Sequence, residues 1–252
     1  MKPIAIQLYT VREYCAQDFP AALKKVAEIG YKGVEFAGMN GMCPCEVKKI
    51  VDELGLEVAS AHMAMPNAEN INALIDECKT LGVTKLVSGY GPDQLGTVEG
   101  CMEAVAQINA AVALLEGTGI SLGIHNHYWE FEKLADGRYP EDILLDNCPG
   151  AFAEMDVYWV AVGGPNPAEA VAERKARVPL LHIKDGDIDP RTPMKAIGSS
   201  GKIDFAAVVA AADPNVLEWN IIEMDEVAGD MWEAVQQSYD FMIKNGLAAG
   251  NK

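Results

Sequence analysis

The stretch Gly123-Ile124-His125-Asn126-His127-Tyr128-Trp129-Glu130-Phe131 is the starting point for interpreting the chain. It continues an apolar run over residues 120–124 that predicts a buried strand. Alternate residues of a strand point to the same side, so His125 and His127 are expected to face one place. A single histidine on an apolar strand is more often a core residue, but imidazole is also the commonest neutral metal ligand and a proton carrier. The choice between these interpretations depends on whether other strands end in the same way.

Short apolar segments alternate with amphipathic segments along the whole chain. Strands are expected at residues 4–9, 33–36, 57–62, 85–88, 120–124, 151–156, 180–183 and 219–222. Helices are expected at residues 19–29, 46–54, 69–81, 98–115, 141–145, 167–176, 205–211 and 230–244, with C-cap glycines at Gly30, Gly55 and Gly82. The strands lack strict polar alternation, as expected where both faces of a parallel sheet are buried. Eight strand–helix units in 252 residues predict an α/β fold, a (β/α)8 TIM barrel of one domain over residues 1–252.

Composition narrows the classes of partner. The formal net charge of −17 repels phosphate backbones, so no nucleic-acid partner is expected. The six cysteines are scattered, and Cys43-Pro44-Cys45 is not a CxxC motif, which favours reduced thiols in a cytoplasmic protein. No leader is recognised after Met1, and no apolar run reaches the ~18 residues of a membrane span, so no membrane partner is expected. The sequence leaves the oligomeric state open, a homo-oligomer included.

Polar residues gather where the predicted strands end, which is where a barrel of this kind carries its active site. They are Tyr9, Glu35, His62, His125, His127, Asp156, His182, Lys184 and Glu223. All four histidines of the chain belong to this set, whereas core histidines would also fall in helices or at strand starts. Two imidazoles and two carboxylates from separate strands form a mixed ligand set for one divalent ion: His125, Asp156, His182 and Glu223. Taken singly, the two acids are also typical of helix N-termini or solvated loops.

The chain resembles the xylose isomerase-like barrel family, often called sugar phosphate isomerases/epimerases, over essentially its whole length. This family includes inosose dehydratases, ketose 3-epimerases and endonuclease IV. The resemblance rests on the order and spacing of IQLYTVR (6–12), GYKGVE (30–35), HNH (125–127), DVYW (156–159), HIKD (182–185), GKIDF (201–205) and IE (222–223).

The resemblance implies one divalent metal, which the family holds with Glu, Asp, His and Glu at the ends of strands five to eight. Asp156, His182 and Glu223 match these residue types, whereas His125 stands where the family has Glu. The histidine makes the site less anionic and favours Mn²⁺, Co²⁺ or Zn²⁺ over Mg²⁺. It also removes one of the two carboxylates that ketose epimerases use as bases. Glu130 is an alternative strand-five ligand if its loop folds back.

We therefore expect a metal-dependent isomerase or epimerase that acts on a sugar, polyol or keto-sugar. The implied chemistry is proton abstraction next to a carbonyl through an enediolate. Glu223 is the expected base, and His127 carries the second proton, or His125 if it does not bind metal. The residues expected to line the substrate pocket are Tyr9, Glu35, His62, Trp159 and Lys184.

Other functions stay open. A dehydratase or lyase of an inosose or 3-keto-sugar is the alternative, because one base carboxylate is missing. A metal-free sugar-binding subunit would also accommodate the histidine at position 125. An endonuclease is disfavoured by the negative charge and by the small number of histidines. The glycine-rich loop at residues 198–201 is either a flexible connection or a phosphate cradle, so phosphorylation of the substrate is not decided.

Overall fold

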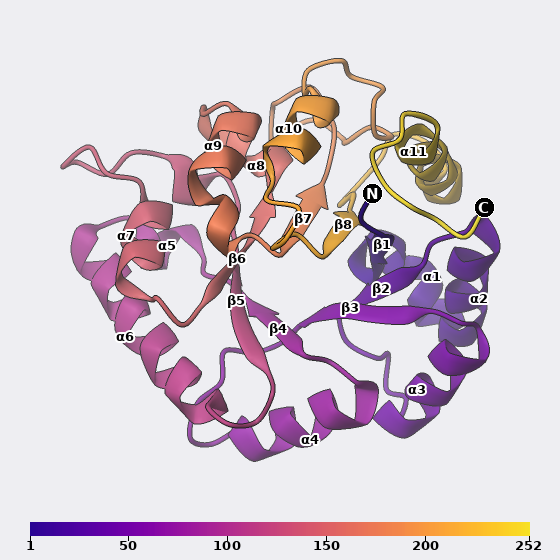
Figure 1. Cartoon of the computed structure of the whole chain (residues 1–252), viewed down its shortest axis with the longest axis horizontal. Coiled ribbons are helices and arrows are strands. Elements are labelled where there is room, and N and C mark those ends of the chain that lie inside the picture. Colours follow the sequence, from indigo (N-terminus) through magenta and orange to yellow (C-terminus); the bar gives the residue numbers. More distant parts are fainter.

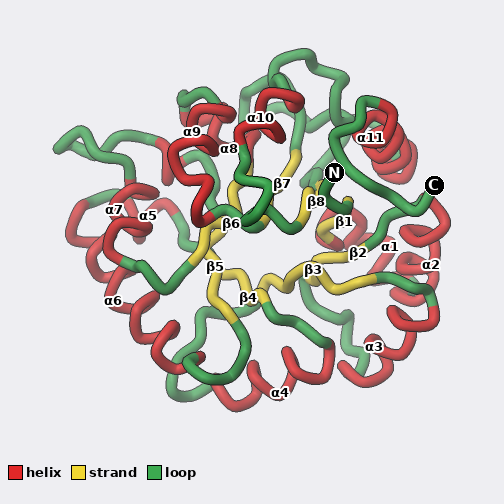
Figure 2. The backbone as a smooth tube through the Cα atoms, viewed as in Figure 1, coloured by secondary structure: helices red, strands yellow, loops and turns green.

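Eight parallel strands close into a barrel in the computed structural model, which describes residues 1–252 (Figure 1). Each strand pairs with the next along the chain, and β8 pairs with β1. Figure 2 shows the strands as the inner ring and the helices around it. The predicted single-domain TIM barrel is confirmed. The strands are β1 (Ile4–Gln7), β2 (Gly33–Phe36), β3 (Glu57–His62), β4 (Lys85–Ser88), β5 (Ser121–His125), β6 (Phe152–Asp156), β7 (Leu180–Ile183) and β8 (Trp219–Ile222).

The outer helices lie close to the predicted ranges. They are α2 (Phe19–Ile29), α3 (Pro44–Glu53), α4 (Ile71–Leu81), α6 (Val98–Leu115), α7 (Pro140–Asn147), α9 (Pro167–Arg174), α10 (Phe205–Ala211) and α11 (Met231–Lys244). The glycines predicted as C-caps all have positive φ, as at Gly82 with φ 80°. Three further helices were not predicted because they are short: α1 (Arg12–Gln17), α5 (Pro92–Leu95) and α8 (Val157–Gly163).

The end of the first strand differs from the prediction. β1 ends at Gln7, and residues Leu8–Val11 form a 3₁₀ turn. The cause is the Gln7 side chain, whose Oε1 accepts a hydrogen bond from the backbone N–H of Tyr9 at 3.0 Å. Tyr9 therefore lies in a turn above the barrel, not on a strand.

The pairing of β2 with β3 contains a register shift. Val34 pairs with Val58, but the next residue, Glu35, pairs with Ser60. The Ser60 hydroxyl donates a hydrogen bond to the Glu35 carboxylate. The shift thus brings the Ser60 hydroxyl and the Glu35 carboxylate together, and both residues are fully buried.

Aromatic rings fill the amino-terminal half of the barrel interior. A Cβ added to Gly33 would lie 2.9 Å from the ring of Trp219, although β2 and β8 are not neighbours, so this ring crosses the interior. A Cβ on Gly123 would lie 2.2 Å from the ring of Phe152, so only glycine fits there. Polar groups are thereby left to the carboxyl-terminal half, which we call the mouth.

The outer helix α6 differs from the expectation that no apolar run is long enough to span a membrane. α6 has 18 residues with a mean hydropathy of 1.3, and by length and composition alone it would cross a membrane. It packs against α5, α7 and β5, and a third of its residues are buried. Outer helices of a barrel have this character without a membrane, so α6 is weak evidence for one.

Candidate active site and metal centre

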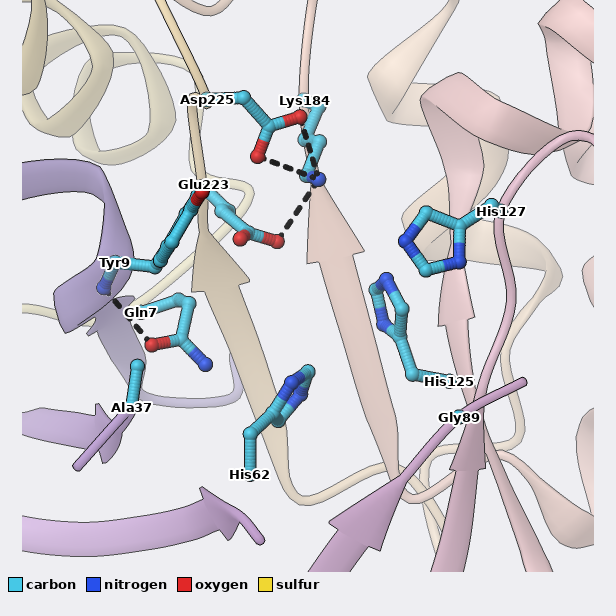
Figure 3. Close-up of a pocket in the computed structure, with 10 residues that line it drawn as sticks. All are labelled: Gln7, Tyr9, Ala37, His62, Gly89, His125, His127, Lys184, Glu223 and Asp225. Atoms are coloured by element: carbon cyan, nitrogen blue, oxygen red, sulfur yellow. Dashed lines mark hydrogen bonds and ion pairs between the residues drawn. The ribbon is translucent and has the colours of Figure 1, made fainter. Parts of the chain in front are cut away.

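The strand ends surround a cavity of about 550 Å³ (Figure 3). Its lining is mostly polar and consists of Gln7, Tyr9, Ala37, His62, Gly89, His125, His127, Lys184, Glu223 and Asp225. Most of the residues predicted to face a substrate are among them. Gln7 and Asp225 were not predicted, although Asp225 lies two residues beyond Glu223. A polar cavity of this size fits a hydroxyl-rich small molecule better than an apolar one.

The four residues predicted to bind a metal come together in the structure. One ligand atom from each of His125, Asp156, His182 and Glu223 lies within 4.8 Å of the others, and all four residues are buried. His182 Nδ1 is 2.8 Å from Glu223 Oε2. We call these four residues the outer set. Metal binding by the outer set stays a prediction.

A second group of potential ligands shares two of these histidines. His62, His125, Glu154 and His182 also offer ligand atoms within 4.8 Å of one another, and we call them the inner set. Glu154 Oε2 lies 2.6 Å from His62 Nε2, 3.1 Å from His125 Nδ1 and 3.2 Å from His182 Nε2. Glu154 was missed in the sequence, although it lies two residues before Asp156 on β6 and so shares its face.

Glu35 lies beneath the cavity and does not line it. Its side chain is fully buried and accepts hydrogen bonds from Gln7 Nε2 at 2.5 Å and from the Ser60 hydroxyl. His182 Nε2 lies 2.7 Å from Glu35 Oε1. The contacts favour a supporting position beside the inner set over the predicted direct contact with substrate.

Lys184 is a buried cation at the mouth. Its Nζ lies 2.9 Å from Glu223 Oε2, 3.1 Å from Asp156 Oδ2 and 3.4 Å from Asp225 Oδ2. Figure 3 shows the ammonium between Glu223 and Asp225 at the edge of the cavity. Burial alone would lower the pKa of Lys184, but the surrounding carboxylates raise it above its usual value. Lys184 is therefore charged at neutral pH.

The other charges at the mouth follow from burial and from their neighbours. Burial and the charge of Glu154 raise the pKa of Glu35 to about 7. Burial alone would lower the pKa of His62, but Glu35 and Glu154 outweigh it and raise that pKa to about 9. Burial raises the pKa of Asp156 to about 6, with Lys184 opposing the shift. The cluster therefore holds protons as well as negative charge.

His127 lies on the cavity wall as predicted, stacked on Trp129 with ring centroids 4.2 Å apart. Burial and the charge of Lys184 lower the pKa of His127 to about 4, so its imidazole is neutral at pH 7. Its Nδ1 is buried and has no hydrogen-bond partner. The neutral ring lines the cavity and can therefore accept a hydrogen bond or a proton from a ligand.

Glu130 does not take the place of His125. Its Oε2 accepts a hydrogen bond from the backbone N–H of His127 at 2.8 Å, and its side chain belongs to neither ligand set. Buried Glu130 instead fixes the turn that carries His127.

The two predicted aromatic pocket residues differ in position. Tyr9 is 46% exposed on the rim of the cavity, with the Arg12 guanidinium 4.2 Å from its ring centre. Trp159 is buried behind the wall, where its ring centre is 5.3 Å from Lys184 Nζ. Trp159 thus packs around the lysine and does not line the cavity.

The glycine-rich loop is held by a carboxylate of the protein itself. Asp185 accepts hydrogen bonds from the backbone N–H and the hydroxyl of Ser200, and from the N–H of Gly186. A negative group of the protein thus already occupies the amide of Ser200, which argues against a phosphate at this point of the loop.

The donor set at the mouth fits a divalent ion. One buried carboxylate oxygen, Glu154 Oε1, has no hydrogen-bond donor, and the buried Asp156 Oδ2 has only the Lys184 ammonium, 3.1 Å away. Imidazole nitrogen combined with carboxylate oxygen is the ligand mixture of Zn²⁺, Mn²⁺ and Co²⁺ sites. Buried oxygens without donors are costly unless a cation lies nearby.

Comparison with known proteins agrees with this architecture. The sequence model of the xylose isomerase-like TIM barrel family matches residues 23–244. None of the curated proteins matches the chain in sequence.

Solved structures similar to this one cover nearly the whole chain. A sugar phosphate isomerase/epimerase from Parabacteroides distasonis is 25% identical with a TM-score of 0.81, over 98% of this chain and 96% of that one. An L-ribulose 3-epimerase is 14% identical with a TM-score of 0.75, over 98% and 95%. The IOLI protein with a bound zinc atom is 14% identical with a TM-score of 0.73, over 97% of each chain. At these identities the latter two show the shared fold alone.

Proposed function

Because this chain belongs to the xylose isomerase-like TIM barrel family, we propose that it is a metal-dependent isomerase or epimerase of a sugar or keto-sugar. The observation that supports this most is the polar cavity of about 550 Å³, whose floor joins histidines and carboxylates from several strands. Similar structures include an isomerase/epimerase, a 3-epimerase and a zinc-binding protein. The substrate class, the reaction and the metal are proposals for this chain.

The proposed ion is held by His125 and His182, which belong to both ligand sets, with carboxylates that differ between the sets. The outer set adds Asp156 and Glu223, as the sequence predicts. A bound Mn²⁺, Co²⁺ or Zn²⁺ would polarise the substrate carbonyl and acidify the neighbouring C–H bond.

Glu223 is the proposed base. Lys184 and His182 hold its pKa low despite burial, so the carboxylate is ionised at neutral pH. Both neighbours contact Oε2, which leaves Oε1 to accept a proton from a ligand in the cavity. The Lys184 ammonium, 2.9 Å from Glu223, is placed to stabilise negative charge on a substrate oxygen.

His127 is the proposed partner for the second proton transfer. It lines the same cavity as Glu223, and its neutral imidazole can accept a hydrogen bond from a substrate hydroxyl. Because its imidazole is neutral, His127 would first take a proton and then return it.

Dehydration of an inosose or 3-keto-sugar is the alternative reaction, because it begins with the same proton abstraction. A metal-free sugar-binding subunit is the alternative without catalysis. The ligand atoms gathered in both sets favour an enzyme over this binding role.

The test is solvent exchange. Protein stripped with chelator and reloaded with Mn²⁺, Co²⁺ or Zn²⁺ is incubated in D₂O with a panel of keto-sugars and inososes. We expect metal-dependent deuterium at the carbon next to the carbonyl, detected by NMR, and none with E223Q. Loss of water from the product would identify the dehydratase, and sugar binding without exchange under any metal would contradict the enzymatic proposal.

A further inference from the structure

The charges around the cavity bear on which sugars it can take. Lys184 is the only lysine or arginine among its lining residues, whereas the acids Glu223 and Asp225 both line it. The Lys184 ammonium already faces three carboxylates: Glu223 at 2.9 Å, Asp156 at 3.1 Å and Asp225 at 3.4 Å. The protein thus balances the charge of Lys184 more than once, which leaves little attraction for a phosphate dianion.

We propose that the cavity takes an uncharged sugar, polyol or keto-sugar and excludes its phosphate esters, and that Asp225 determines this specificity. The inference rests on the proposed function and narrows its substrate class. The Asp225 side chain is 35% exposed and lies at the edge of the cavity (Figure 3). A carboxylate in this position accepts hydrogen bonds from sugar hydroxyls but repels a phosphate.

The loops that hold phosphate in other barrels are acidic in this chain. Phosphate-binding barrels use the loops after strands seven and eight, together with the N-terminus of a nearby helix. Here these loops are residues 184–204 and 223–230, and the second contains no lysine or arginine. Their acids are Asp185, Asp187, Asp189, Asp204, Glu223, Asp225, Glu226 and Asp230. The usual place for a phosphate therefore carries negative charge.

The helix N-termini that follow these loops are capped by the protein itself. Asp204 accepts a hydrogen bond from the backbone N–H of Ala207 at 3.0 Å, at the start of α10. Asp230 accepts one from the backbone N–H of Glu233 at 2.9 Å, at the start of α11. A phosphate at either helix would have to compete with an aspartate that already holds a backbone amide.

Two bases of the loop after β7 are paired within that loop. Lys195 Nζ lies 2.6 Å from Asp187 Oδ1, and Arg191 Nη2 lies 2.7 Å from Asp189 Oδ2. Neither base lines the cavity. The loop therefore does not direct these two positive charges toward a ligand.

Arg12 offers the alternative contact for a phosphate. It donates a hydrogen bond to the backbone oxygen of Tyr9 at 2.9 Å, and its guanidinium lies 4.2 Å from the ring centre of Tyr9. Arg12 lines a separate groove of about 190 Å³, which Glu13, Asp225 and Asp230 also line. A phosphate that reached Arg12 would meet these acids, so the groove disfavours it as well.

The experiment compares matched pairs of ligands on Mn²⁺-loaded protein. The pairs are ribulose and fructose, each with and without a terminal phosphate, and myo-inositol with its monophosphate. Calorimetry measures the affinities, and solvent exchange is followed by NMR on the same pairs. The variants are D225N at the cavity and R12M in the groove. E226Q is the matched control, because Glu226 is the next acid along the chain but lines only the groove.

The readout for each variant is the ratio of the affinities for the free and the phosphorylated form. We expect the wild type to bind the free form about tenfold or more tightly, because like charges brought together repel. D225N should reduce this ratio about fivefold, whereas E226Q and R12M should keep it within about twofold of the wild type. Circular dichroism verifies that each variant is folded.

Two results would overturn the inference. Tighter binding of a phosphate ester than of its free sugar by the wild type would contradict the substrate class, and loss of that advantage in R12M would place the phosphate at Arg12. A ratio that D225N leaves unchanged would contradict the role of Asp225.

Failure of the proposed function is distinguishable. If a phosphate ester exchanges a proton and its free sugar does not, the enzymatic proposal stands and this inference falls. If free sugars bind more tightly than their esters but none exchanges a proton with any metal, the ligand class stands and the enzymatic proposal falls. If neither form of any pair binds, this inference falls whatever the reaction.

Discussion

The protein buries charged side chains in two places that differ in what surrounds them. At the mouth, Glu154 is buried among three histidines beside a cavity. Behind the barrel wall, the buried acids Glu130 and Glu141 and the half-buried Asp142, Arg174 and Arg177 form a second cluster, which we call the clasp.

The arginines of the clasp bind the protein itself. Arg177 donates hydrogen bonds to the backbone oxygens of Leu145, Cys148 and Ala151, and Arg174 pairs with Asp142. The clasp contains no histidine, and none of its residues lines the cavity at the mouth. Burial of charge therefore does not mark a functional site by itself; histidines next to an open cavity do.

The largest effect that separates the two clusters is on catalysis. E223Q should lower kcat about a hundredfold to ten-thousandfold, because it removes the proposed base while keeping the size of the side chain. The measurement is the initial rate on whichever substrate shows solvent exchange. E141Q in the clasp should keep the wild-type rate per folded molecule. An equal loss of rate in both variants would contradict the view that the mouth is catalytic and the clasp is structural.

The next effect is on stability. R177M should lower the free energy of unfolding by about 3 kcal/mol, because several buried carbonyl oxygens lose a charged donor. Urea unfolding at pH 7.5 measures this loss. Co²⁺ affinity should remain at the wild-type value, and a parallel loss of affinity would show that the clasp supports the metal site.

A pH-dependent effect comes from Glu141. Burial raises its pKa to about 7, with Arg174 opposing the shift. The folded protein thus favours the neutral acid, so the contribution of Glu141 to stability is full below its ordinary pKa and is lost as the pH rises through 7. Glutamine cannot ionise, so the stability of E141Q does not fall in this way as the pH rises.

Relative to the wild type, E141Q should therefore gain up to about 3 kcal/mol between pH 5 and pH 8, at about 1.4 kcal/mol for each pKa unit. Urea unfolding of both proteins at the two pH values measures the difference. A difference that does not change with pH would mean that Glu141 is already ionised in the folded protein.

The smallest effect is expected at an exposed pair. Lys85 and Glu218 form an ion pair at 2.6 Å, and the Glu218 side chain is half exposed. K85M should change the free energy of unfolding by about 0.5 kcal/mol or less, because exposed ion pairs contribute little. A larger loss would show that surface charge matters as much as the clasp.

Much of the architecture could be predicted from the sequence. The strands are short apolar runs and the helices are longer amphipathic segments, so their order alone indicates a barrel. The helix α8 escaped prediction because it follows β6 without a loop, with Asp156 both ending the strand and capping the helix. Short helices of this kind carry too little periodicity to be recognised.

The candidate site was predicted in part. His125, Asp156, His182 and Glu223 converge because each ends a strand, which a barrel gathers at one edge. Glu154 was missed because it lies inside an apolar strand, one layer below the residues that end the strands. The ion pairs of Lys184 could not be predicted either, because they join three strand ends through side-chain conformations that the sequence does not specify.

The offset pairing of β2 with β3 has a consequence for how this chain can vary. Neighbouring residues of a strand face opposite sides, so Glu35 and Phe36 would exchange places if β2 slipped by one residue. The Phe36 ring would then enter the cluster of histidines at the mouth. The Glu35 carboxylate would face the apolar layer between the strands and the outer helices. A single-residue insertion or deletion in β2 would thus disrupt the candidate site and destabilise the fold together, whereas a point substitution can affect either one alone.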